Sequence, residues 1–300
     1  LEELVPFTIK RDNIPVKTVD VSYMINDTLG YIKLSKFART SYAEIREALE
    51  KLNERGVRSL IIDLRDNTGG YFDQSWKLAN EFLERGDEVV YMEGRRRNRE
   101  EFRADGKGPF QDMELSVLIN EGTASSSEIF AGAMQDNGRA TIVGRRSFGK
   151  GLVQEPFYFN DGSGMRITVA RFYTPSGRCI QKPYSDDYDY EVYRRYDEGE
   201  MVSADSMKIE KGGILPDIFV PLDTTKAGSF YIACNRKASS MRFASAYFDE
   251  HKEELSGISD YDALIAYLDN ADLERAFLQY AKREDGLVPS AAEWRTDRKY

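Results

Sequence analysis

The chain has 300 residues, enough for one to three domains with a sizeable apolar core. Asp and Glu number 51 against 42 Lys and Arg, so the formal net charge is −9, and such an acidic chain argues against general nucleic-acid binding. A hydrophobic content of 41% excludes a disordered chain, and no run of 18 apolar residues is present that could cross a membrane. The only histidine, His251, excludes a multi-histidine metal site, and Cys179 and Cys234 lack metal-ligand spacing. We therefore expect no metal and no cofactor.

Residues 5–22 predict short extended pieces interrupted by Pro6 and Pro15. No basic-then-apolar leader is visible, so an export signal or a membrane anchor is expected only in sequence upstream of Leu1.

From Gly30 to Val143, strand-type and helix-type patterns alternate along the chain. Residues 57–64 form a continuous apolar run of strand length, which is typical of a strand buried on both faces of a parallel sheet. Strands are expected at 30–34, 57–64, 89–92, 115–120 and 141–143, and helices are expected to begin near 41, 72 and 125. Repeated strand–helix–strand units predict an α/β fold with parallel pairing.

The pattern changes after Lys150. Two strand-like segments flank the turn sequence 160–164 and predict a β-hairpin. Residues 184–200 are rich in tyrosine and acidic residues and predict a solvated loop. A short strand is expected at 218–220, and the chain is predicted to be mainly helical from residue 223 onward.

Two loops follow predicted strands at the edge where α/β proteins place their sites. Residues 65–70 end in Gly69-Gly70, which frees the backbone to direct N–H groups at a ligand. Residues 121–128 lead into a helix through Ser125, Ser126 and Ser127. Ser125 with Glu128 also fits a helix-capping box with no chemistry. As a nucleophile, a serine there would profit from the helix N-terminus and would still need a base.

Because histidine is nearly absent, lysine is the candidate base. A lysine must lose about 3 pK units from its free value near 10.4 to act at neutral pH, which requires removal from water. Lys150 lies between two glycines after Phe148 and fits a lysine held against an apolar wall, although Gly-Lys-Gly is equally typical of an ordinary loop.

Four ordered segments resemble motifs of the carboxy-terminal processing, or tail-specific, proteases of peptidase family S41. They are DLRDNTGG (63–70), GTASSSEIFAGAMQDNGRATIVGRRSFGKGLVQ (122–154), ITVARFYTPSGRCIQ (167–181) and GGILPDI (212–218). The 25 residues between Ser125 and Lys150 are the spacing that this family uses, and the resemblance extends from about residue 19 to 222. It implies a core like that of the Clp protease and crotonase superfamily, with an added β-hairpin region and a helical C-terminal extension.

The resemblance also implies a domain order and an activity. Residues 1–18 resemble the last strand of a PDZ domain, 19–222 the S41 core, and 223–300 a mainly helical extension. The implied activity is that of an endopeptidase that cleaves proteins near their C-termini in the periplasm or cell envelope, by a Ser–Lys dyad through an acyl-enzyme. The implied partners are protein and peptide substrates bound through their C-termini, and the oligomeric state stays open.

Residue roles follow from matching positions. Ser125 corresponds to the nucleophile, although spacing alone does not exclude Ser126, and Lys150 corresponds to the general base. The oxyanion donors are expected to be the N–H of Ser126 and that of Gly69 or Gly70. Thr68 stands where proline is common in the family, a departure that would loosen this loop.

Two further positions match residues with conditional roles. Gln154 corresponds to a residue that orients the lysine, but four residues along a straight strand span about 13 Å, so the role requires a bend after Lys150. Asp136 corresponds to a carboxylate that some members need, yet it lies at the far end of its helix, which favours a structural role.

Two other functions remain as alternatives. A non-catalytic binder that keeps the fold would be favoured by loss of Ser125 or Lys150, and both are present. An acyl-CoA enzyme of the crotonase type would have no use for a Ser–Lys pair. Digestion of an unfolded protein, and its loss in Ser125→Ala, would separate the three.

Overall fold

The computed structural model describes residues 17–184, 191–204, 211–223, 227–258 and 260–299. Most of the expected PDZ strand, residues 1–16, lies outside these ranges, as do residues 185–190 of the predicted loop. The described residues form two compact units, one made of 17–23 and 27–221 and the other of 24–26 and the chain from Leu222 onward. None of the described helices is long and apolar enough to cross a membrane.

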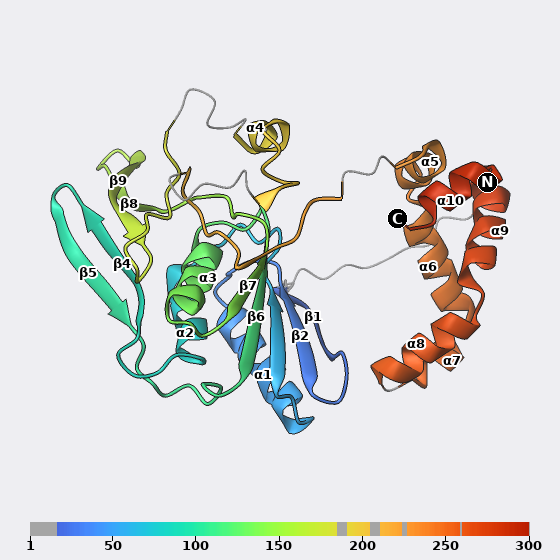
Figure 1. Ribbon diagram of the computed structural model, residues 1–300, viewed down its shortest axis with the longest axis horizontal. Helices are drawn as coiled ribbons and strands as arrows, with labels where there is room; N and C mark the ends of the chain where they lie inside the picture. Colours follow the sequence, from blue (N-terminus) through green and yellow to red (C-terminus); the bar gives the residue numbers. More distant parts are fainter. Residues whose placement is uncertain (1–16, 185–190, 205–210, 224–226, 259, 300) are drawn as a thin grey trace. The chain divides into compact units, whose positions relative to one another are not determined.

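Parallel strands form the centre of the larger unit (Figure 1). The strands of the chain are β1 (Val19–Met24), β2 (Leu29–Leu34), β3 (Ser59–Asp63), β4 (Glu88–Gly94), β5 (Arg97–Arg103), β6 (Glu114–Ile119), β7 (Thr141–Gly144), β8 (Leu152–Tyr158), β9 (Gly164–Tyr173) and β10 (Ile218–Phe219). Six of them form a sheet in the order β1-β2-β3-β6-β7-β10, in which the pairs β2–β3, β3–β6, β6–β7 and β7–β10 are parallel. A second sheet, β5-β4-β9-β8, is antiparallel.

Three helices bury their apolar faces in this unit. They are α1 (Ser41–Glu54), α2 (Phe72–Asn80) and α3 (Ser126–Asp136). α1 packs on β2, α3 packs on β7, and α2 lies between α1 and α3 (Figure 1). Ile62 of β3 and Val117 of β6 are register partners and are almost completely buried, as expected for central strands of a parallel sheet. The predicted α/β fold with parallel units and a β-hairpin is confirmed.

The prediction of a solvated loop at 184–200 is wrong for residues 191–200. This segment contains the helix α4 (Glu191–Asp197), and the side chains of Glu191, Arg195 and Glu200 are buried. Ion pairs, rather than apolar contacts, hold the segment, and a search for apolar periodicity cannot detect them.

The second unit is helical, as predicted. Its helices are α5 (Ser229–Arg236), α6 (Ser239–Glu250), α7 (Lys252–Ser256), α8 (Tyr261–Asn270), α9 (Leu273–Asp285) and α10 (Ala291–Asp297). A small core of Phe230, Cys234 and Ala281, with Phe277 and Trp294 packed against it, joins α5, α9 and α10.

Candidate active site

Three loops follow neighbouring parallel strands and therefore lie at one edge of the six-stranded sheet. The register pairs the end of β3 with the end of β6, and the end of β6 with the end of β7. The carboxyl ends of parallel strands meet at the same edge, so the loops that leave these strands come together. We call them the glycine loop (64–70), the serine loop (120–125) and the lysine loop (145–150).

Ser125 ends the serine loop in a strained backbone conformation. Its φ is 58° and its ψ is −119°, a region that residues with a side chain rarely adopt. Ser125 is partly exposed, whereas the next two serines are buried. Their hydroxyls donate to backbone carbonyls of the glycine loop, Ser126 to Gly70 (2.9 Å) and Ser127 to Asn67 (3.1 Å). These bonds give Ser126 and Ser127 a structural task and leave Ser125 as the accessible serine of the three.

Gly69 lies directly against Ser125. A Cβ atom added at Gly69 would be 2.6 Å from the carbonyl oxygen of Ala124 and 2.8 Å from the Cβ of Ser125, and its φ of +88° also favours glycine. The Gly69 N–H donates to the Asn67 side chain (2.9 Å). Within the described residues, the N–H groups of Gly70 and Ser126 make no hydrogen bond. Of the three predicted oxyanion donors, Gly70 and Ser126 therefore have unoccupied N–H groups, while that of Gly69 is engaged.

Lys150 ends the lysine loop with its side chain exposed. The expected removal of this lysine from water is therefore absent in this structure. Its side chain instead lines an open pocket of about 550 Å³. The loop turns at Gly149 (φ +88°) just before Lys150. The other lining residues are Asp66, Thr68, Glu121, Gly122, Ala124 and Phe148.

Glu128 joins the serine loop to the lysine loop. Its completely buried carboxylate accepts the N–H groups of Ser125 (2.8 Å) and Lys150 (2.8 Å) on Oε2, and it accepts the N–H of Gly149 (2.7 Å) and the hydroxyl of Ser147 on Oε1. Burial raises the pKa of this carboxyl, and the four hydrogen bonds oppose that shift. The capping-box pattern predicts only the bond to Ser125, so sequence reasoning missed that Glu128 also fixes the lysine loop.

Gln154 and Asp136 lie on other elements. Gln154 is exposed in β8, and its amide donates to Thr168 of β9 (3.4 Å), so the bend that would turn it toward Lys150 is absent from this conformation. Asp136 is the last residue of α3; it accepts the N–H of Ser176 (2.9 Å) and pairs with Arg178. Burial of Asp136 favours the neutral acid, but hydrogen bonds from Thr174 and Ser176 outweigh burial and hold the pKa of the carboxyl below its usual range.

Asp63 braces the start of the glycine loop, a role that the sequence did not indicate. Its fully buried carboxylate accepts the Tyr31 hydroxyl (2.6 Å) and the backbone N–H of Arg65 (2.9 Å), and it pairs with the Arg65 guanidinium (2.7 Å). Burial opposes ionisation, yet the hydrogen bonds from Arg65 and Tyr31 outweigh it and lower the pKa of Asp63 from its ordinary value of 3.8. The ionised carboxylate therefore stabilises the native loop.

Asp63→Asn should reduce the free energy of unfolding at pH 7 by about 1.5–3 kcal/mol, the usual range for a hydrogen bond to a charged group. Because the pKa of Asp63 is lower in the folded state, its contribution is present above pH 3.8 and disappears as the pH falls through the folded value. Urea unfolding between pH 7 and pH 3 should show the difference between wild type and variant shrinking below about pH 4. Asp73→Asn, at an exposed ion pair with Lys77, is the control and should change little. A pH-independent difference for Asp63→Asn would contradict this assignment.

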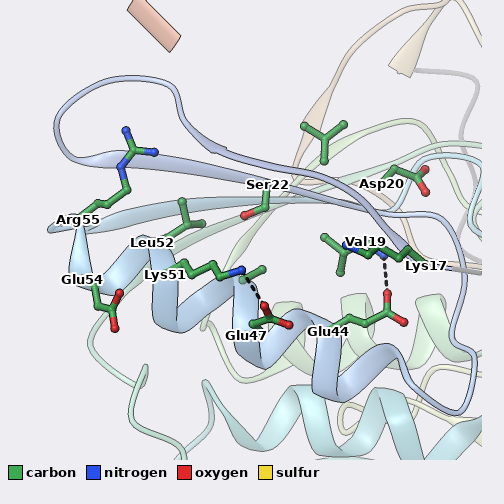
Figure 2. A pocket seen from close by; sticks show the side chains of 12 residues that line it. Lys17, Val19, Asp20, Ser22, Glu44, Glu47, Lys51, Leu52, Glu54 and Arg55 are labelled. Atoms are coloured by element: carbon green, nitrogen blue, oxygen red, sulfur yellow. Dashed lines mark hydrogen bonds and ion pairs between the residues drawn. The ribbon is translucent and has the colours of Figure 1, made fainter. Parts of the chain in front are cut away.

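A second pocket, of about 530 Å³, lies between β1 and α1 (Figure 2). Three of its charged groups have partners: Lys51 pairs with Glu47 (2.6 Å), and the Glu44 carboxylate accepts the N–H groups of Thr18 (2.6 Å) and Val19 (3.2 Å). This pocket brings together none of the residues discussed above. Across the described ranges, no group of three His, Cys, Asp or Glu side chains is arranged to hold a metal ion.

Comparisons with known proteins place this site in context. A sequence model of peptidase family S41 matches residues 28–192, more than half of the chain. A probable CtpA-like serine protease of Staphylococcus epidermidis is 40% identical over 174 residues, which are 57% of this chain and 35% of the relative. A carboxyl-terminal-processing protease of Synechocystis sp. is 41% identical over 181 residues, 59% of this chain and 42% of the relative. The matches thus span less than half the length of either relative.

One solved structure supports the same relationship. The photosystem II D1 C-terminal processing protease is 29% identical and superposes with a TM-score of 0.55, covering 72% of this chain and 51% of its own.

Proposed function

Because this chain belongs to peptidase family S41, we propose that it is a serine endopeptidase that cleaves proteins near their C-termini with Ser125 and Lys150 as a catalytic dyad. One observation carries the proposal: a single oxygen of Glu128 accepts the backbone N–H groups of both residues, each at 2.8 Å. The backbones of the partly exposed serine and the exposed lysine are thereby held on one carboxylate oxygen at the edge of the sheet. The names of the Synechocystis relative and of the solved D1 protease support C-terminal processing as the activity.

In the proposed reaction, the Ser125 hydroxyl attacks the scissile carbonyl carbon while the Lys150 amine takes its proton. The resulting oxyanion is stabilised by the unoccupied N–H groups of Ser126 and Gly70. Collapse breaks the C–N bond, and Lys150 returns the proton to the leaving amine. Water then attacks the acyl-enzyme while Lys150 takes its proton, and as the acyl C–O bond breaks Lys150 returns that proton to the Ser125 oxygen, which releases the acid and free Ser125.

Because Lys150 is exposed in this structure, the bound substrate is proposed to shield it from water. A peptide that fills the pocket of about 550 Å³ excludes water from the Lys150 side chain. Phe148 and Ala124 supply apolar surface in this pocket. The base is thus proposed to become competent as the substrate binds.

The remaining predicted residues have narrower proposed roles. Gln154 orients Lys150 only if the start of β8 bends when substrate binds; in the present conformation it pairs with Thr168. Asp136 is proposed to be structural, because it anchors the turn after β9 through Ser176 and Arg178.

We also propose the domain order that the family resemblance implies, with the end of a PDZ domain at 1–18, the peptidase core at 19–222 and a helical extension at 223–300. The proposed location is the periplasm or cell envelope, and the proposed partners are unfolded or flexible protein C-termini.

Digestion of an unfolded protein tests the function. Wild type should release short C-terminal fragments that mass spectrometry assigns to cuts close to the end of the substrate, and Ser125→Ala should release none. Absence of digestion by wild type would overturn the peptidase assignment. Cuts spread evenly along the substrate would retain the peptidase and overturn the preference for C-termini.

A further inference from the structure

A buried ionic cluster connects the α4 segment to the lysine loop. The Arg146 side chain is completely buried, and its guanidinium donates to Glu191 (3.0 Å) at the start of α4 and pairs with Glu200 just beyond its end. Lys182 pairs with the same Glu191 (3.3 Å), and its ammonium lies 4.1 Å from the centre of the Phe148 ring. In Figure 1, α4 is the short olive helix of the larger unit. The helix is thus held by Arg146 of the lysine loop and by Lys182, whose ammonium contacts Phe148 of the same loop.

Arg195 of α4 contacts the backbone of the lysine loop directly. Its buried guanidinium donates to the carbonyl oxygens of Arg146 (2.5 Å) and Ser147 (3.1 Å), while its Nε donates to Glu200 (3.0 Å). The neighbouring Arg194 makes a different contact: it is exposed and pairs with Glu198 on the helix surface (3.8 Å). Two adjacent arginines of one helix therefore differ in burial and in partners, and only Arg195 contacts the lysine loop and Glu200.

The bonds continue from Arg195 to the dyad. Ser147, whose carbonyl Arg195 binds, donates its hydroxyl to Glu128 and accepts the N–H of Ile214 (2.7 Å) on the same oxygen. Glu128 in turn accepts the N–H groups of Lys150 and Ser125. A shift of the Arg146–Ser147 carbonyls would therefore move the bonds that fix both reactive residues.

The cost of the cluster argues for a specific geometric task. Replacing buried ion pairs by well-packed apolar side chains often leaves stability unchanged or increases it, so buried charge is a weak way to brace a helix. A planar guanidinium, however, can bind two carbonyls and a carboxylate in fixed directions, which an apolar side chain cannot.

From these contacts we propose that Arg195 is a positioning residue for Lys150, with α4 acting as a clamp that sets the conformation of the lysine loop. This proposal rests on the proposed Ser–Lys function. The clamp acts through the backbone of Arg146 and Ser147 and does not itself contact the substrate.

Arg195→Gln is the test, with Arg194→Gln as the matched control. On a short activated peptide ester, Arg195→Gln should lower kcat by about 10- to 100-fold, because small displacements of a reacting group have effects of this size. KM should stay within about 3-fold, because the pocket is unchanged when a positioning contact alone is lost. Hydrogen exchange should also be faster at the amides of Gly149 and Lys150 in Arg195→Gln. Arg194→Gln should match wild type in all three measurements.

The outcomes separate the two proposals. Equal kcat in the two variants, or faster exchange confined to α4, would show that α4 has only a structural role and would overturn the inference. If wild type hydrolyses no ester, the peptidase proposal fails, and exchange at Gly149 and Lys150 still decides whether Arg195 holds the loop.

If Arg195→Gln does not fold, Arg195→Lys with Arg194→Lys as control replaces it. Lysine keeps the charge beside Glu200 but cannot bind both carbonyls. A kcat equal to that of Arg194→Lys would overturn the proposal, and a reduced kcat at unchanged KM would support it.

Discussion

Replacing Ser125 or Lys150 with alanine should lower kcat/KM by about four orders of magnitude, and the double variant should be barely worse than either single one. The reason is that nucleophile and base act as one unit, so removal of either ends the same chemistry. The measurement is hydrolysis of an unfolded substrate, together with labelling by a fluorophosphonate, which should modify Ser125 in wild type and fail to react in Lys150→Ala. If Lys150→Ala kept more than about a tenth of the activity, the dyad assignment would be wrong.

His251→Ala provides the control for this experiment. His251 follows α6 in the helical unit, where its ring stacks on Tyr247 at 4.1 Å and its Nδ1 lies 3.0 Å from the Tyr247 carbonyl. These contacts give it a local structural role, so its removal should leave kcat unchanged. A large loss of kcat in a folded His251→Ala protein would instead favour a histidine base.

Glu128→Gln should cause the second large effect, on stability and on activity together. Glutamine offers one acceptor oxygen, whereas both carboxylate oxygens of Glu128 receive hydrogen bonds. In either amide orientation the NH₂ group faces two donors: Ser125 and Lys150 on one side, or Ser147 and Gly149 on the other. We expect a loss of about 2–4 kcal/mol in the free energy of unfolding, the range for breaking a buried charged network.

The activity of Glu128→Gln should fall by about 100-fold or more at a temperature where the variant is folded, because a fixed contact is lost either at both reactive residues or at the two residues Ser147 and Gly149 of the lysine loop. Urea unfolding and ester hydrolysis on the same samples measure the two effects. Glu47→Gln, which loses only an exposed pair with Lys51, is the control and should leave the free energy of unfolding nearly unchanged. Near-wild-type activity of Glu128→Gln would show that the shared carboxylate does not position the dyad.

The strands of the central sheet could be predicted from the sequence because a strand buried on both faces consists mostly of consecutive apolar residues. The run at 57–64 contains β3 and the segment 115–120 overlaps β6, and their pairing brings the glycine and serine loops together as expected for parallel strands. The resemblance to family S41 identified the same loops, and the family is confirmed by the match over 28–192.

Other features of the site depend on contacts that no local pattern records. Four donors from two loops converge on Glu128, and only one of them, Ser125, is a neighbour in sequence. The buried side chains of Arg195 and Glu200 belong to a segment whose composition is typical of a solvent-exposed loop. The exposure of Lys150 likewise results from how the loop turns, which the residue types alone do not determine.

The parallel order of the sheet also affects when, during synthesis, the proposed site can be complete. β3 pairs with β6 across an insertion that includes α2 and the β4–β5 hairpin, and Lys150 follows β7, which pairs with β6. Pairings between such distant segments form late in folding because a long loop must close first. A nascent chain that already displays Ser125 therefore has no assembled base, no seated α4 and no complete oxyanion site. On the proposed function, the site is therefore complete only after the lysine loop has joined the sheet, and cleavage should begin only in the folded chain.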